Sequence, residues 1–88
     1  MPQKNKKDKQ GYHLSSILKG ELGKISKIKE ELLELEDAEK QGTKIMIGVE
    51  LSDLYGAVEA YAETQGLTME DLKIFSDITK RAFKNGRR

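Results

Sequence analysis

Residues 45–58, IMIGVELSDLYGAV, form an apolar stretch that nevertheless carries two acids. Glu50 and Asp53 are three positions apart, so in a helix their carboxylates lie on one face, one turn from each other. The stretch contains no Lys or Arg that would neutralise them. An unpaired charge among apolar neighbours is costly, so a divalent cation or a basic residue of another helix is expected to pair with these acids. The stretch alone leaves both alternatives open, together with a solvent-facing position for the two acids.

The composition is that of one small domain. Its 88 residues include no cysteine, which excludes disulfides, thiol chemistry and zinc–thiolate sites. Sixteen basic residues nearly balance fifteen acidic ones, so the net charge of +1 offers no general case for nucleic-acid binding. The longest apolar run is too short for a bilayer span, and no signal-peptide pattern opens the chain. We therefore expect no membrane insertion and a cytoplasmic location.

The chain divides into a basic tail and one helical domain. Residues 1–11 contain four lysines and no hydrophobic periodicity, which is typical of a flexible tail. Residues 12–88 are expected to form the domain, beginning with a short helix over residues 12–22 that ends near Gly20. His13, the only histidine, stands at the start of that helix, where a cap or surface role is more common than a ligand role.

Start and stop signals then predict two long helices joined by a tight turn. The first helix runs from Ser26, its N-cap, to Gln41, and Gly42 lies just past its end. The second follows Thr43 as N-cap and runs to about Gln65, directly before another glycine. Short connections of this kind usually join antiparallel neighbours, so the sequence predicts a helical hairpin.

A third helix completes an all-α fold. It begins at a capping box formed by Thr68 and Asp71 and stops at Gly86. The apolar residues of the second helix cover more than one of its faces, so one side is expected to pack within the chain and another against a second subunit. The predicted architecture is therefore a helical hairpin plus a third helix, assembled into an oligomeric helical bundle.

Four acids are placed symmetrically about the turn between the first two helices. Glu34 and Glu50 lie eight residues before and after Gly42, and Glu31 and Asp53 lie eleven residues before and after it. In an antiparallel hairpin each pair lies level, and both acids of each helix share one face. The spacing thus permits all four carboxylates to converge in one groove.

Converging carboxylates repel one another unless some are protonated or cations bind between them. A site made of oxygen ligands favours hard ions, meaning Mg²⁺ or Mn²⁺, and Mg²⁺ commonly takes phosphate oxygens as further ligands. A metal-bound water can then act as the nucleophile in hydrolysis of a nucleotide or polyphosphate. The alternative is a charged hairpin whose acids meet lysines in three dimensions.

The acidic segments resemble a known signature. Residues 30–34 read EExxE and residues 50–53 read ExxD, and together they are similar to the signature of the MazG-like nucleoside triphosphate pyrophosphohydrolases. The resemblance covers about residues 14–88. It implies an all-α fold, assembly as a homodimer or homotetramer, and Mg²⁺-dependent hydrolysis of (d)NTP to (d)NMP and pyrophosphate. The phosphoribosyl-ATP pyrophosphohydrolases have a similar helical core.

The resemblance also implies roles for individual residues. The metal-binding and catalytic set is Glu31, Glu34, Glu50 and Asp53, with Glu30 in a supporting position. The basic residues expected to contact substrate phosphate are Lys27, Lys80, Arg81 and Lys84. The aromatic residues that can stack on a base, or instead belong to the core or an interface, are Tyr12, Tyr55 and Phe83.

Two other functions stay open from the sequence. A non-catalytic helical interaction module would use its basic ends to bind an acidic partner or nucleic acid, with the acids facing solvent. A phosphoribosyl-ATP pyrophosphohydrolase would use the same metal-binding acids on a different nucleotide. Bound Mg²⁺ would stabilise either enzyme but not the interaction module.

Overall fold

The computed structural model describes residues 13–86, and this part of the chain is all-α. Its helices are α1 (Ile25–Gln41), α2 (Lys44–Thr64) and α3 (Met69–Lys84). The predicted basic tail over residues 1–11 lies outside the described residues, as does Tyr12. None of the described helices has the length and apolar character needed to cross a membrane.

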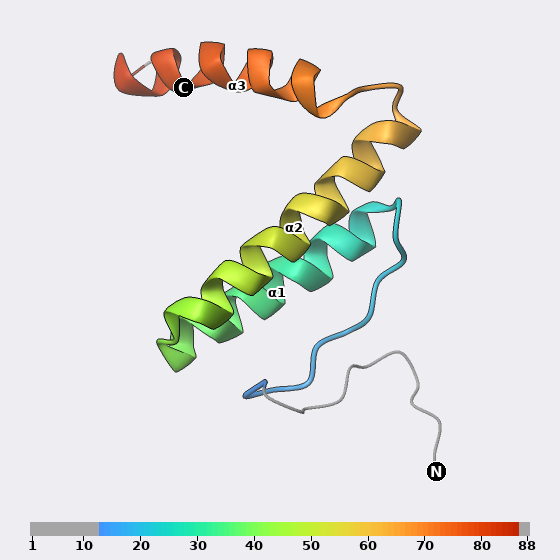
Figure 1. The fold of residues 1–88 in the computed structure, drawn as a ribbon, viewed down its shortest axis with the longest axis vertical. Helices are drawn as coiled ribbons and strands as arrows, with labels where there is room; N and C mark the ends of the chain where they lie inside the picture. The colour runs from blue at the N-terminus through green and yellow to red at the C-terminus, as the bar shows by residue number, and fades with distance from the viewer. Residues whose placement is uncertain (1–12, 87–88) are drawn as a thin grey trace.

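Helices α1 and α2 form the predicted hairpin and pack against each other side by side (Figure 1). The turn depends on Gly42, whose φ of 75° lies in the left-handed region that favours glycine. Its N–H donates to the carbonyl oxygens of Ala38 and Glu39 and so closes the C-terminus of α1. Thr43 follows as the N-cap of α2, in extended conformation.

The start of α1 differs from the prediction. The N-cap is Lys24 rather than Ser26, and Ser26 lies in the first turn of the helix. Its hydroxyl oxygen accepts a hydrogen bond from the backbone N–H of Glu21 at 3.0 Å. The prediction was wrong because Ser26 bonds to the segment before the helix instead of capping the helix itself.

The start of α3 agrees with the prediction in detail. The Thr68 hydroxyl accepts from the N–H of Asp71 at 3.0 Å, and the Asp71 carboxylate accepts from the N–H of Thr68 at 2.9 Å. Both bonds of the capping box are thus present. The residue types at positions 68 and 71 were therefore sufficient to predict where α3 begins.

The predicted short helix over residues 12–22 is not formed in residues 13–22, which run without helical structure. Residues 13–24, here called the strap, pass along α1 in the opposite direction to it (Figure 1). Two α1 carboxylates hold the strap, because Asp37 accepts the N–H of Leu14 at 2.8 Å and Glu30 accepts the N–H of Gly20 at 2.8 Å. These backbone N–H groups therefore bond to side chains instead of forming a helix.

Gly20 is required by the close approach of the strap to α1. A Cβ atom at this position would overlap the backbone of Ser26 and Lys27 in the first turn of the helix. Gly20 therefore lies in a loop, as predicted, but its role is to let the strap pass close to the first turn of α1 and not to end a helix.

The face of α1 that packs inside the molecule is acidic. Its buried residues are Glu30, Glu31, Glu34, Asp37 and Ala38. The large apolar residues Leu32 and Leu33 are instead 46% and 44% exposed. The buried apolar residues of the described chain are Ile17, Ala38, Ala57 and Ala62. Polar contacts between α1, α2 and the strap therefore take much of the place of a hydrophobic core.

Helix α3 leaves the end of α2 and extends away from the hairpin (Figure 1). The extensive helix packing of the described chain is between α1 and α2. The apolar side chains of α3 are accordingly more than half exposed: Ile74, Phe75, Ile78 and Phe83. The described part of one chain therefore contains the predicted hairpin and third helix, and α3 packs little against the other two helices.

Candidate metal centre

The four symmetrically placed acids meet in the groove between α1 and α2. Glu31 and Glu34 of α1 and Glu50 and Asp53 of α2 each have a carboxylate oxygen within 4.8 Å of those of the other three. Each helix contributes two acids one turn apart, and the antiparallel turn at Gly42 brings the two pairs level. Four carboxylate oxygens at this spacing can bind a divalent cation.

The centre is closed at one end and open at the other. Glu50 is completely buried, with 0% exposure, and Glu31 and Glu34 are 4% and 6% exposed. Asp53 is exposed and lines a neighbouring cavity. A ligand can therefore reach the centre from the side of Asp53.

The close carboxylates change one another's protonation. Burial, and then the neighbouring charges of Glu31 and Glu50, raise the pKa of Glu34 to about 9. Burial also raises the pKa of Glu31, although Lys27 opposes the change. Without a cation, the centre therefore holds at least one proton near neutral pH, on Glu34. A divalent cation would replace that proton and neutralise the carboxylates.

Lys27 lies at the edge of the centre. Its Nζ atom is 3.1 Å from Glu30 Oε1 and 3.1 Å from Glu31 Oε2. Burial lowers the pKa of Lys27, but the hydrogen bonds to these two carboxylates outweigh burial and leave it raised. Lys27 is therefore charged, and it lies beside the cavity where a phosphate group can reach it.

Glu30 has a structural position next to the centre. It is 2% exposed and bonds to Gly20 of the strap and to Lys27, and its Oε2 lies 3.8 Å from Lys19 Nζ. Burial would raise its pKa, but the Gly20 N–H and the two lysines outweigh burial and lower it. Glu30 is thus an ionised residue that fixes the strap, in agreement with a supporting position.

One oxygen of the centre is available for a cation. This oxygen is Oε1 of Glu31, whose Oε2 contacts Lys27. Oε1 is buried and has no hydrogen-bond partner within residues 13–86. A buried acceptor without a partner costs about 1–3 kcal/mol, and more when it is charged. A cation bound among the four acids would satisfy this oxygen. The oxygen donors fit Mg²⁺ or Mn²⁺.

A cavity of about 560 Å³ opens beside Glu31 and Asp53. Its lining residues are Leu22, Lys27, Glu31, Ser52, Asp53, Gly56, Ala57, Glu59, Ala60 and Glu63. The α2 wall consists largely of small side chains, and a Cβ atom at Gly56 would have no neighbour within 4 Å. The volume falls in the range of small-molecule sites.

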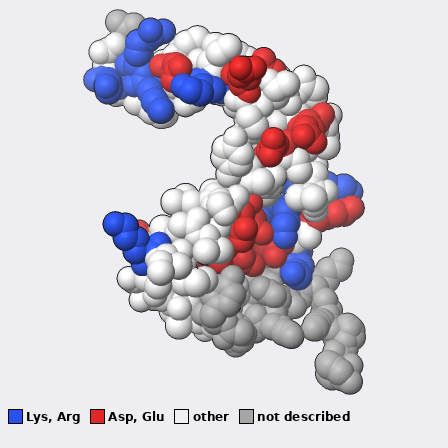
Figure 2. Space-filling model, viewed as in Figure 1, with Lys and Arg blue, Asp and Glu red and all other residues white. Residues whose placement is uncertain are grey.

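The basic residues predicted on α3 are not part of this centre in one chain. Lys80, Arg81 and Lys84 lie on the last turns of α3 and are absent from the described lining of the cavity. Figure 2 shows one group of Lys and Arg side chains at the free end of α3, away from the acids of the hairpin, whereas other Lys side chains lie beside those acids. Their separation follows from the path of α3, which does not fold back over α1 and α2.

His13 is a residue of the centre that the sequence did not indicate. It is buried, at 8% exposure, rather than at a helix cap or on the surface. Its Nε2 atom lies 3.9 Å from Glu34 Oε2, and His13, Glu34 and Glu50 have possible ligand atoms within 4.8 Å of one another. No periodicity indicated this contact, because it depends on the path of the strap.

Comparisons of the chain with models of protein families, with curated proteins and with solved structures gave no match. The MazG-like resemblance of the EExxE and ExxD segments therefore stays an expectation from the sequence. A proposal of function therefore has to rest on the four converging carboxylates and the cavity beside them.

Proposed function

We propose that the protein is a Mg²⁺-dependent nucleoside triphosphate pyrophosphohydrolase of the MazG-like type, which converts (d)NTP into (d)NMP and pyrophosphate. The main support is the convergence of two acid pairs from antiparallel helices, with ligand oxygens within 4.8 Å of one another. The open cavity of about 560 Å³ beside Glu31 and Asp53 gives such a centre room for a nucleotide.

The four acids would hold the cation, with Mn²⁺ as a possible substitute for Mg²⁺. When bound, the cation supplies an activated water for attack on the α-phosphorus and neutralises negative charge on the phosphates. Glu31, Glu34 and Glu50 are buried and therefore fixed in position. Asp53 is at the cavity side, and Lys27 offers an ammonium group to the phosphates.

The cavity lining favours hydrolysis by water over a covalent enzyme intermediate. Its hydroxyl-bearing residue, Ser52, donates its hydroxyl to the carbonyl oxygen of Val49 at 3.0 Å. The described lining places no histidine or cysteine beside this hydroxyl. A nucleophilic serine needs such a base within hydrogen-bond reach. In the proposed reaction a water oxygen bonds to the α-phosphorus, and the bond from that phosphorus to the bridging oxygen of pyrophosphate breaks.

The proposal includes assembly with further copies of the same chain, as a homodimer or homotetramer. The apolar side chains of the hairpin and of α3 are exposed in one chain, among them Ile45, Leu51 and Phe75 at 76%, 50% and 55%. Exposed apolar area of this extent usually marks an interface. A second copy is the occupant we propose, because its basic α3 complements the acidic groove of the first. In that arrangement Lys80, Arg81 and Lys84 would contact phosphate in the site of the other copy.

The test is a panel of NTPs, dNTPs and phosphoribosyl-ATP incubated with Mg²⁺ and scored for pyrophosphate release. The wild-type chain is expected to release pyrophosphate from at least one NTP or dNTP. Glu50→Gln and Asp53→Asn should abolish release while the far-UV circular dichroism stays helical. Glu39→Gln is the matched control, because Glu39 is an exposed acid of α1 outside the centre.

Three outcomes would contradict the proposal. Release from phosphoribosyl-ATP alone would identify the related hydrolase activity instead. Full activity of both Glu50→Gln and Asp53→Asn would remove the centre from the reaction. Inactivity on the whole panel, with no thermal stabilisation by Mg²⁺, would favour the non-catalytic interaction module.

A further inference from the structure

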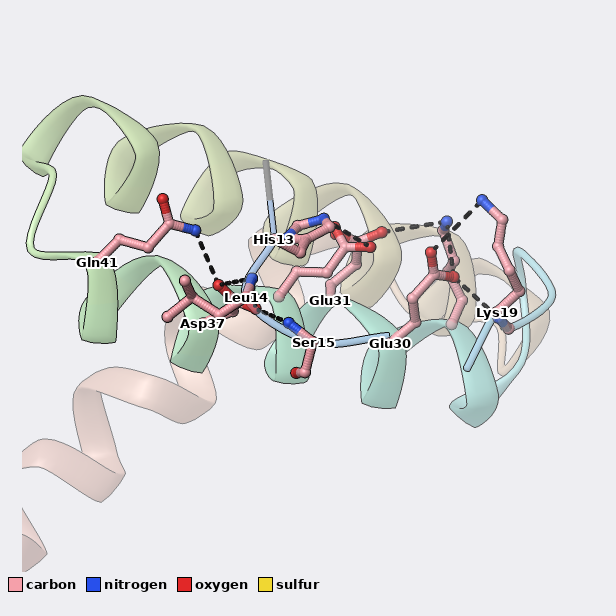
Figure 3. A network of polar contacts seen from close by, with 11 residues as sticks. His13, Leu14, Ser15, Lys19, Glu30, Glu31, Asp37 and Gln41 are labelled. Atoms are coloured by element: carbon pink, nitrogen blue, oxygen red, sulfur yellow. Dashed lines mark hydrogen bonds and ion pairs between the residues drawn. The ribbon is translucent and has the colours of Figure 1, made fainter. Parts of the chain in front are cut away.

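The strap delivers His13 to the closed end of the metal centre. The Asp37 carboxylate accepts the N–H of Leu14 at 2.8 Å and that of Ser15 at 3.3 Å (Figure 3). The Gln41 side chain donates to the same carboxylate at 2.8 Å and holds it in place. His13 directly precedes the two clamped residues, so its backbone is fixed against α1.

The imidazole of His13 is close to two of the four acids. Its Nε2 atom is 3.9 Å from Glu34 Oε2, and one ligand atom each of His13, Glu34 and Glu50 lies within 4.8 Å of the other two. A separation of 3.9 Å is too long for a hydrogen bond. Two atoms that each bind one cation at about 2.1 Å are about 3–4.2 Å apart. The spacing therefore fits two ligands of one ion with little movement.

These three side chains are buried and do not line the cavity. His13, Glu34 and Glu50 are 8%, 6% and 0% exposed, and none of them lines the cavity described above. The open end of the centre, at Glu31 and Asp53, thus has oxygen donors, and the closed end has a nitrogen donor as well.

We infer that His13, Glu34 and Glu50 form a second cation position with mixed nitrogen and oxygen ligands, next to the oxygen-only position at Glu31 and Asp53. This position selects a transition-metal ion such as Zn²⁺ over Mg²⁺, because imidazole suits Zn²⁺ and Mg²⁺ prefers oxygen. Glu34 and Glu50 bridge the two positions. The inference rests on the same carboxylates as the proposed function, but it concerns metal binding and does not require hydrolysis.

The charges of the centre agree with two cations. Neutral imidazole adds no charge, so one divalent ion at the closed end balances Glu34 and Glu50. A second divalent ion at the open end balances Glu31 and Asp53. Lys27 lies beside Glu30 and Glu31 and gives the open end an additional positive charge that suits a phosphate ligand.

The first test uses the wild-type chain, in which His13 is the only histidine. Nitrogen-15 NMR of a histidine-labelled sample reports on this imidazole alone. Addition of Zn²⁺ should shift one ring nitrogen to the position of a metal-bound imidazole, and addition of Mg²⁺ should not. Zn²⁺ binding, seen by calorimetry, with both ring nitrogens unshifted would overturn the inference.

The second test compares metal affinities of His13→Gln and wild type by calorimetry. Loss of a ligand should weaken Zn²⁺ binding about 10–100-fold or more, because even loss of a side chain that only orients a ligand has that effect, and should leave Mg²⁺ binding within about twofold. The amide signals of Leu14 and Ser15 show whether the strap stays clamped. His13→Asp should restore binding but move the preference back toward Mg²⁺, since it replaces nitrogen by oxygen. An unchanged ratio of Zn²⁺ affinity to Mg²⁺ affinity in His13→Gln would contradict the second position.

Pyrophosphate release separates this inference from the proposed function. Metal binding at His13 without hydrolysis of any nucleotide would leave the second position standing and reject the enzyme. Hydrolysis that persists with an unshifted His13 ring would reject the second position and leave the enzyme.

Discussion

The carboxyl groups of Glu34 on α1 and Glu50 on α2 lie close together, with ligand oxygens within 4.8 Å of each other, and both side chains are buried in the groove of the hairpin. Two buried carboxyl groups at this distance repel each other when both are ionised, so burial and the nearby charges of Glu31 and Glu50 raise the pKa of Glu34 to about 9 and it keeps its proton near neutral pH. This proton is present when no metal is bound, and a divalent cation would displace it and neutralise the carboxylates instead. This contact therefore connects the stability of the hairpin with pH and with metal binding.

The metal-free protein should lose stability as pH rises from about 4.5 to about 9. The pKa of Glu34 is raised from 4.5 to about 9 on folding, so across this interval the folded chain binds a proton that the unfolded chain has lost. Stability from Glu34 is thus complete below pH 4.5 and disappears as pH passes about 9. A loss of 1 kcal/mol lowers Tm by about 4–8 °C in a domain of this size.

Thermal melts in chelator across this pH range measure the effect. Glu34→Gln should remove the alkaline decline, because glutamine has nearly the same size and does not titrate. Asp37 provides an internal comparison. Burial alone would raise its pKa, but its hydrogen bonds to Gln41, Leu14 and Ser15 outweigh burial and lower the pKa. The contribution of Asp37 to folding stability is therefore lost only at acid pH. A Tm that stays constant or rises between pH 5 and 9 would contradict the protonated centre.

Asp37→Asn should release the strap from α1. The substitution removes the carboxylate that accepts the N–H groups of Leu14 and Ser15 and the side-chain amide of Gln41. Loss of charged hydrogen bonds to buried groups is expected to cost about 1–3 kcal/mol. Urea unfolding measures the cost, and hydrogen exchange at Leu14 and Ser15 locates it. Glu36→Gln is the control, because the neighbouring Glu36 is exposed; equal effects of both variants would contradict the clamp.

Gly56→Leu should block the nucleotide cavity, whereas Gly48→Leu should not. Both glycines lie within α2, and a Cβ at either position has no neighbour within 4 Å, so neither substitution should disturb the single chain's fold. Only Gly56 lines the cavity. The KM for the nucleotide should therefore rise on the order of tenfold or more in Gly56→Leu alone. Steady-state kinetics on both variants check this, and equal KM values would place the nucleotide elsewhere.

Leu51→Glu should weaken self-association. Leu51 is 50% exposed on α2 and lines an apolar groove with Leu32, Leu35 and Ile47. A charge buried in an interface between copies is costly, so the variant should shift the assembly toward single chains. Light scattering at several concentrations measures the mass. Lys44→Glu serves as the control on the same helix, since Lys44 is exposed and polar; a wild-type chain that is monomeric throughout would reject the proposed assembly.

The sequence by itself determined the parts of the fold that depend on near neighbours. Gly42 ends α1 in the left-handed conformation, and Thr68 and Asp71 start α3 with both bonds of the capping box. The same local logic placed the four acids, because residues three apart share a helix face and equal spacing from Gly42 makes the pairs level. Such features were predictable because each depends on residue types within a few positions or on a count along a helix.

Only the tertiary structure decided the path of the strap and the direction of α3. The bonds from Asp37 to Leu14 and Ser15 join residues 23 and 22 positions apart, and no local pattern encodes them. They turned a predicted helix into an extended strap and moved His13 from an expected surface position into the metal centre. Helix α3 has a well-defined start but exposed apolar residues, because a capping box fixes where a helix begins and not what the helix packs against.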